Sequence, residues 1–377
     1  MEVTVSKRVK WVRPALRALA VLVLVVVAGL LVFPPGRYLL RAGWEEGKIL
    51  ARRRPIRGLV ADPATPPDLR SRLALVLSAR AFAQDSLGLE SGESFTTYSA
   101  LDRDTLVLVL SGAYRDRLES FTWWFPIVGR VPYKGYFDFA EARRQERELT
   151  LRGFDARLGA ASAFSTLGWF NDPLLPSTLH SDSLTLVNTV IHELTHNTYY
   201  APGGAVFNES FANFVGSRGA EQFFRDRGQA TAADDARAQW ADEKVMGGFW
   251  ASLYERIDSM FKAHPGDEPA QVAQRIAVRD SIYATARERL VHDLGPQLRG
   301  ISSRRVKRIR LDNAILMSRR VYLTDLEVFD NVLTRHRGNL RSTIAAIIAA
   351  AKSNRDHPFA AVLALAGDAA DSSAPAH

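Results

Sequence analysis

The chain of 377 residues contains no cysteine. This absence excludes disulfide bonds, zinc sites built from thiolates and a lipid attached to an N-terminal cysteine. The chain also has little net charge beyond its N-terminus. Residues 1–54 hold eleven Lys and Arg against three acids, whereas the other 323 residues balance 38 basic with 38 acidic side chains. The formal charge of +8 is therefore not spread over the folded part, and we expect no nucleic-acid partner.

Only one long apolar run is present, at residues 18–36, and it follows a basic segment at residues 1–17. The run is near the lower length limit of a membrane-spanning helix, and no small-residue cleavage site follows it. We therefore predict an uncleaved transmembrane anchor behind a cytoplasmic N-terminus. In a bacterium this places the large domain, predicted at residues 37–355, in the periplasm and attached to the inner membrane. Residues 356–377 are predicted to form a partly disordered tail.

The segment 190–197 contains the pattern HExxH, formed by His192, Glu193 and His196. On a helix, two histidines four residues apart project from one face, so both imidazoles can bind one metal ion. Glu193 lies about 100° around the helix from His192, where its carboxylate can reach a metal-bound water without ligating the metal. Polar residues at 181–183 offer caps for such a helix.

A second segment, residues 207–213, is predicted to complete the metal site. Catalytic zinc takes three protein ligands and leaves one position open, and Glu209 is the best candidate for the third ligand. Asn213, one turn later, is a candidate to hydrogen-bond a ligand histidine without itself touching the metal. Gly216 and Ala220 share the face of Glu209, and their small size would allow this helix to approach the first one closely. The sequence thus predicts a zinc site formed by His192, His196 and Glu209.

The remaining periodicity indicates an α+β fold that is mostly helical. Helical patterns are assigned to residues 241–262, 270–290, 326–333 and 340–352, strand patterns to 105–110 and 120–136, and a helix capped by Asp138 to the stretch ending near Gly153. Residues 160–170, just before the metal helix, read as a further strand. Within it, Ser165, Thr166, Leu167 and Gly168 are predicted to pair with an extended peptide substrate, with an ordinary core strand as the alternative.

Several motifs together carry a family resemblance: the HExxH segment, residues 208–213, residues 125–135, residues 165–170 and the pair Asn313-Ala314. With them the chain resembles the bacterial predicted-aminopeptidase family of gluzincin-like zinc peptidases, from roughly residue 38 to 350. The resemblance implies a zincin-like active-site helix packed on a small mixed sheet. It also implies Zn²⁺ on His192, His196 and Glu209, with Glu193 as general base. Many relatives carry a lipobox cysteine, which this chain lacks. Asn213 stands where thermolysin-like motifs have an acid. Its amide would raise the basicity of a ligand histidine less than a carboxylate would.

We therefore expect a membrane-anchored zinc peptidase, an aminopeptidase by resemblance, that acts on peptide substrates. Glu193 would take a proton from the attacking water and deliver it to the leaving amine. Tyr322, which follows the family-like Asn313-Ala314 pair, is predicted to stabilise the oxyanion; Tyr199 and Tyr200 are rivals for this role.

Two alternatives stay open from the sequence. One is a membrane-anchored binding or scaffold protein with a non-catalytic zinc site, which the lack of an obvious fourth ligand disfavours. The other is a zinc hydrolase that acts on a non-peptide amide. The sequence distinguishes neither endopeptidase from aminopeptidase action nor one oligomeric state from another.

Overall fold

The computed structural model describes residues 34–101, 107–125, 129–160, 173–320 and 325–367, together with the single residues Arg17, Val21, Gly29 and Val32. Most of the predicted membrane span at residues 18–36 therefore lies outside the described residues. Among the helices that the structure does describe, none is both long and apolar enough to cross a membrane.

Helices dominate the described chain, which confirms the mostly helical α+β fold class. The helices are α2 (Pro34–Ala51), α3 (Ile56–Ala61), α4 (Pro67–Asp85), α5 (Phe139–Leu151), α6 (Pro176–Leu179), α7 (Ser183–Thr198), α8 (Ala205–Asp226), α9 (Ala230–Ala263), α10 (Pro269–Glu288), the π-helix η1 (Arg289–Leu294), the 3₁₀ turn η2 (Gly295–Gln297), α11 (Ser303–Lys307), α12 (Asn313–Arg320), α13 (Leu326–Arg335), α14 (Leu340–Ser353) and α15 (Pro358–Gly367). The strands are β1 (Arg53–Pro55), β2 (Thr97–Ser99), β3 (Leu108–Tyr114), β4 (Ser120–Phe121), β5 (Trp123–Phe125), β6 (Gly129–Val131), β7 (Tyr133–Tyr136) and β8 (Phe154–Ala160).

The largest sheet is built around β3, which pairs with β8 on one side and with β4 and β7 on the other. Every pair of named strands in the described chain is antiparallel, so the mixed sheet expected from the resemblance is not seen there. Parallel pairing is limited to an isolated bridge between Tyr98 and Leu174. Helix α5 covers one face of this sheet, and Asp138 caps it as predicted, by accepting hydrogen bonds from Ala140 N and Glu141 N.

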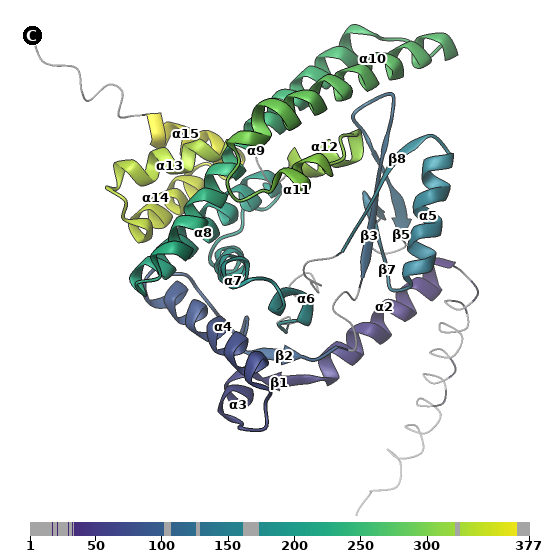
Figure 1. Cartoon of the computed structure of the whole chain (residues 1–377). Helices are drawn as coiled ribbons and strands as arrows, with labels where there is room; N and C mark the ends of the chain where they lie inside the picture. The colour runs from purple at the N-terminus through teal and green to yellow at the C-terminus, as the bar shows by residue number, and fades with distance from the viewer. Residues whose placement is uncertain are drawn as a thin grey trace, which may run out of the picture.

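The helix with the HExxH pattern, α7, packs mainly against α4 and α8 rather than on the sheet. This differs from the expected arrangement and has a simple cause. The apolar stripe of α7 has helical partners on both sides and is fully enclosed by them. Its buried members are Leu184, Leu186, Val187, Val190, Ile191 and Leu194. Figure 1 shows α7 in the helical part of the molecule, apart from β3, β7 and β8.

A buried polar cluster joins α8, α9 and α13 behind this layer. The carboxylate of Asp330 accepts hydrogen bonds from Trp240 Nε1 at 2.8 Å, from Lys244 Nζ at 2.8 Å and from Arg218 Nε at 2.9 Å. Burial raises the pKa of Asp330, but the hydrogen bonds and the charges of Lys244 and Arg218 outweigh it and lower the pKa below its usual value. The carboxylate is therefore ionised at neutral pH and holds three helices together.

A second polar cluster fastens α12 to the sheet. Asn313 donates to the carbonyl of Tyr114 on β3 at 2.7 Å, and its backbone N–H donates to Asp155 on β8 at 2.9 Å. Its side-chain oxygen accepts from Arg279 Nε and from the hydroxyl of Tyr283 on α10. Asn313 belongs to the Asn-Ala pair singled out in the sequence, and its visible role is to position α12.

The C-terminal helices cover the far side of α8. Helix α15 follows the predicted boundary at residue 355 and packs against α13 and α14. Its Phe359 ring lies 5.3 Å from the ring of Phe207 and 5.9 Å from that of Phe329, between ring centroids. This aromatic cluster lies beneath the start of α8, the segment that carries Glu209.

We expect Asp330→Ala to lower the free energy of unfolding by about 3 kcal/mol, because it leaves Arg218, Lys244 and Trp240 without their shared acceptor. The matched control is Asp234→Ala: Asp234 is 69% exposed and pairs with Arg237, and its loss should cost no more than about 0.5 kcal/mol. Urea unfolding measures both values. Equal effects of the two substitutions would contradict a stabilising role for the cluster.

Candidate metal centre

Helix α7 presents its two histidines because its ends are fixed. Asp182 caps the N-terminus, where its carboxylate accepts from Thr185 N and Thr185 Oγ1 at 2.8 Å each. The helix ends at Thr198 because Tyr199 is extended, with φ −152°. The predicted cap and the apolar stripe are thus confirmed, and they orient the opposite face of α7, with His192 and His196, away from the core.

Glu209 is positioned by the residue before it. The side chain of Asn208 accepts from the backbone N–H of Ala201 at 2.8 Å and donates to the carbonyl of Ala201 at 2.9 Å. This two-way bridge closes the loop between α7 and α8 and is itself buried. Asn208 was part of the sequence motif, but its role required the loop geometry to be known.

Close packing of α7 on α8 brings the histidines of α7 near to Glu209 of α8. A Cβ placed on Gly216 would lie 2.7 Å from Asn188 Oδ1, 3.0 Å from the carbonyl oxygen of Asn188 and 3.2 Å from His192 Cβ. One turn on, a Cβ on Gly219 would lie 3.0 Å from Ile191. The predicted close approach of the two helices is therefore confirmed, and it depends on missing side chains directly beneath His192.

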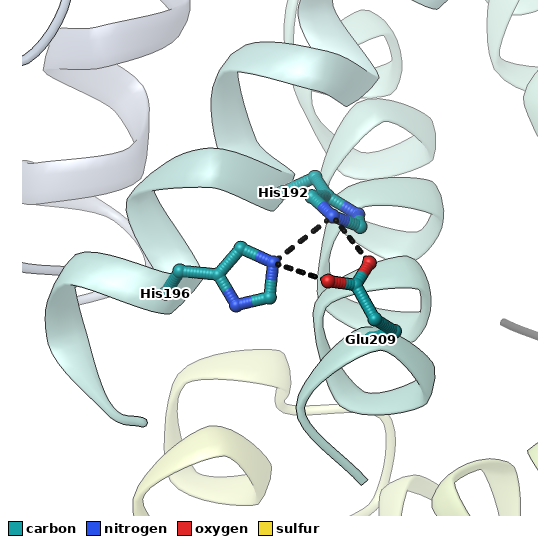
Figure 2. Close-up of side chains that lie close together, drawn as sticks. All are labelled: His192, His196 and Glu209. Atoms are coloured by element: carbon teal, nitrogen blue, oxygen red, sulfur yellow. Dashed lines mark hydrogen bonds and ion pairs between the residues drawn. The ribbon is translucent and has the colours of Figure 1, made fainter. Parts of the chain in front are cut away.

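The three predicted ligands converge on one point (Figure 2). His192 Nε2 lies 3.2 Å from His196 Nε2 and 3.5 Å from Glu209 Oε2, and His196 Nε2 lies 3.6 Å from Glu209 Oε1. Ligands bound to tetrahedral zinc at about 2.0–2.1 Å are about 3.3–3.4 Å from one another. The spacing of these donor atoms therefore fits a single zinc ion.

The protonation states also suit a metal. Burial, together with the charge of His192, lowers the pKa of His196 to about 4 against the opposing charge of Glu209. Burial raises the pKa of Glu209, but the hydrogen bond and charge of His192 and the charge of His196 lower it overall. At neutral pH the site thus offers a neutral imidazole and an ionised carboxylate, the forms in which these groups bind metals.

Within the described residues, no other His, Asp or Glu joins these three as a possible ligand. Two imidazole nitrogens and one carboxylate form a donor set of catalytic zinc sites, in which the fourth position stays open for water or substrate. The three side chains are 15–25% exposed, so the site is partly enclosed but open to solvent. Glu193 follows His192 directly and is half-buried.

Some of the other predicted site residues lie outside the part of the chain that the structure describes. Tyr322 and the segment with Ser165, Thr166, Leu167 and Gly168 lie outside the described residues, so their roles stay predictions. Asn213 lies on α8 one turn after Glu209, and its predicted contact with a ligand histidine also stays a prediction.

The two rival tyrosines differ in their surroundings. Tyr199 packs against the ring of Phe207, with centroids 6.4 Å apart, and beneath Lys352. Tyr200 is 59% exposed, and its ring centroid lies 6.4 Å from that of His196. Of these two, Tyr200 is the one beside the metal ligands.

One acidic residue near the centre was missed by sequence reasoning. Glu243 lies on α9, and its Oε2 is enclosed without a hydrogen-bond partner among the described residues. The pKa of Glu243 is raised to about 7, chiefly by burial and also by the charge of Asp242, against the opposing charges of His192 and Arg319. Glu243 belongs to no pattern in the sequence, and its place becomes visible only when α8 and α9 are known to pair. Gly228 lies at the turn between α8 and α9, and Glu243 follows it by fifteen residues, as Asn213 precedes it by fifteen.

Comparison with known proteins identifies the family. A profile of the family described as "Putative aminopeptidase" matches residues 37–360. The chain belongs to this family. The family's description indicates peptidase activity, which agrees with a cluster of side chains that could hold a metal ion, two of them from the HExxH segment. A search of curated proteins and a search of solved structures each found no match.

We expect Gly216→Ala to weaken zinc binding, because the added methyl group must push α7 and His192 away from α8. The free energy of unfolding should fall by about 1 kcal/mol, although alanine has a better helix propensity than glycine. Gly248→Ala is the matched control, since Gly248 is also helical but has nothing within 4 Å of the added Cβ. It should be neutral or stabilising by up to about 1 kcal/mol. Competition with a chromogenic chelator measures zinc affinity, and identical affinities in both variants would contradict the packing argument.

Proposed function

We propose that this member of the aminopeptidase family is a zinc-dependent peptidase that removes residues from the N-termini of peptides. The observation that carries the proposal is the convergence of His192, His196 and Glu209 at separations suited to zinc, with Glu193 between the two histidines on the same helix. A fourth ligand is lacking among the described residues, which favours a catalytic over a closed structural site.

A bound zinc ion would supply Lewis acidity and make an attacking water more acidic. Glu193 would accept the proton of that water as it attacks the scissile carbonyl, and would then deliver the proton to the leaving amine. Tyr322 would donate a hydrogen bond to the developing oxyanion, and Asn213 would orient a ligand histidine. The backbone from Ser165 to Gly168 would pair with the extended substrate.

The proposal also includes a membrane anchor. Residues 18–36 are apolar and uncharged, and a basic segment precedes them. Such a pattern favours a single span with the N-terminus in the cytoplasm and the peptidase domain in the periplasm.

This topology predicts that a C-terminal tag on the full chain is digested by protease added to intact spheroplasts, whereas an N-terminal tag is protected until lysis. Deleting residues 1–36 should move the protein from the membrane to the soluble fraction. A C-terminal tag that is protected in intact spheroplasts would overturn the periplasmic orientation.

For catalysis, we expect the full chain, purified in detergent without chelator, to contain about one zinc per chain and to release N-terminal residues from peptides. Glu193→Gln should keep the zinc but lower kcat by about 10²- to 10⁴-fold, because the amide cannot accept the water's proton. Glu90→Gln, an exposed control, should behave like the parent chain. Metal analysis and mass spectrometry of the products measure both properties.

Three outcomes would decide against parts of this proposal. A chain without zinc would remove the metal site. Zinc without hydrolysis of any peptide would favour a binding protein or a non-peptide substrate. Equal cleavage of peptides with free and acetylated N-termini would indicate an endopeptidase.

A further inference from the structure

Glu243 lies at the level of the metal ligands although it is on a different helix. One turn earlier on α9, Trp240 contacts Phe214 of α8, with ring centroids 5.9 Å apart. The two helices form an antiparallel hairpin, so one turn forward along α9 corresponds to one turn back along α8, from Phe214 towards Ser210 and Glu209. The charge of His192 acts on Glu243, which agrees with this placement.

One oxygen of the Glu243 carboxylate has no partner. Its Oε2 is enclosed and accepts no hydrogen bond from the described residues, although the charges of His192 and Arg319 act on the group. Its two neighbours are fully engaged: Asp242 accepts from the backbone N–H groups of residues 299–301, and Lys244 pairs with Asp330 and Glu327. A buried carboxylate without a partner is costly, and a cationic ligand would offset that cost.

Glu243 is not positioned to be a fourth zinc ligand. The ligand atoms of His192, His196 and Glu209 lie within 4.8 Å of one another, and Glu243 is not among the residues that fulfil this condition. An anionic group that binds a free α-ammonium would lie somewhat further out. The α-nitrogen is about 2.5 Å from the scissile carbonyl carbon and its hydrogen-bond acceptor about 2.7–3.2 Å beyond, so the acceptor lies up to roughly 5–6 Å from the carbon that the water attacks.

We propose that Glu243 binds the free α-ammonium group of the substrate and so restricts cleavage to the N-terminal residue. This inference rests on the proposed peptidase function and adds its specificity-determining residue. The carboxylate of Glu243 accepts the N–H bonds of the ammonium group, and the scissile carbonyl then faces the three ligands and Glu193. When an internal peptide bond lies at the metal site, no ammonium group lies against Glu243. Such a bond is therefore cleaved more slowly.

The test compares two substrates in the zinc-loaded full chain: a peptide with a free α-amine and its desamino analogue, in which hydrogen replaces the amine. Glu243→Gln keeps the size of the side chain and removes the charge. We expect kcat/KM for the free-amine peptide to fall about 10- to 100-fold, mainly through KM, since a hydrogen bond to a charged group is lost. The slow cleavage of the desamino analogue should not change. Glu255→Gln, on the exposed side of the same helix, is the control for both substrates.

A binding measurement separates this inference from the proposed function. In a Glu193→Gln background, calorimetry with L-leucinamide should show binding that weakens about 10-fold or more when Glu243→Gln is added, at unchanged zinc content. If the parent chain hydrolyses no peptide but binds L-leucinamide through Glu243, the peptidase function fails and the amine site stands.

Two results would overturn the amine site. One is an equal loss of kcat/KM for both substrates together with a lower zinc content, which would make Glu243 a positioning residue for His192. The other is unchanged kinetics and unchanged L-leucinamide binding in Glu243→Gln.

Discussion

The close contact between α7 and α8 is the constraint on which the metal centre depends. Two candidate ligands come from α7 and one from α8, so the distance between these helices sets the distance between the imidazoles and the carboxylate. Gly216 makes that distance short because it has no side chain beneath His192. The two hydrogen bonds between Asn208 and Ala201 then fix the position of α8 along the axis of α7. The HExxH pattern positions only the two histidines; the helix packing and the loop contact bring Glu209 to them.

Polar networks outside the centre hold the next layer in place. Asp330 joins Arg218 of α8 to Trp240 and Lys244 of α9, so the α8–α9 hairpin has a fixed register. Asn313 fixes α12 to the sheet, and α12 packs in turn on α9. Such networks are specific because each donor and acceptor is satisfied in only one arrangement of the helices. Glu243 lies where these elements meet, and its position is therefore defined by contacts far along the chain.

The sequence predicted what is local. His192 and His196 are related by helical spacing, and Glu209 with its small neighbours follows on the next helix, so their convergence could be expected without coordinates. The small residues of α8 also indicated its close approach to α7. The packing of α7 on α4 in place of a sheet could not be expected, since the same apolar stripe suits a sheet or a helix equally well. Glu243 was missed for a related reason: a single acid on a long amphipathic helix carries no pattern, and only the pairing of α8 with α9 shows its place.

In the proposed amine site, the hairpin of α8 and α9 links the candidate metal ligand Glu209 to the choice of substrate. Glu209 and Glu243 belong to its two arms, so their separation is set by the pairing of the arms and not by the loop segments around the centre. The two carboxylates also have opposite surroundings: histidine charges lower the pKa of Glu209 overall, whereas burial raises that of Glu243. Groups with pKa values separated in this way are suited to different tasks. Glu209 is ionised at neutral pH, which is the form in which a carboxylate binds a metal ion. The other carboxylate, Glu243, is an acid whose charged form gains most when a cation lies against it, which an N-terminal amine supplies and an internal peptide bond does not.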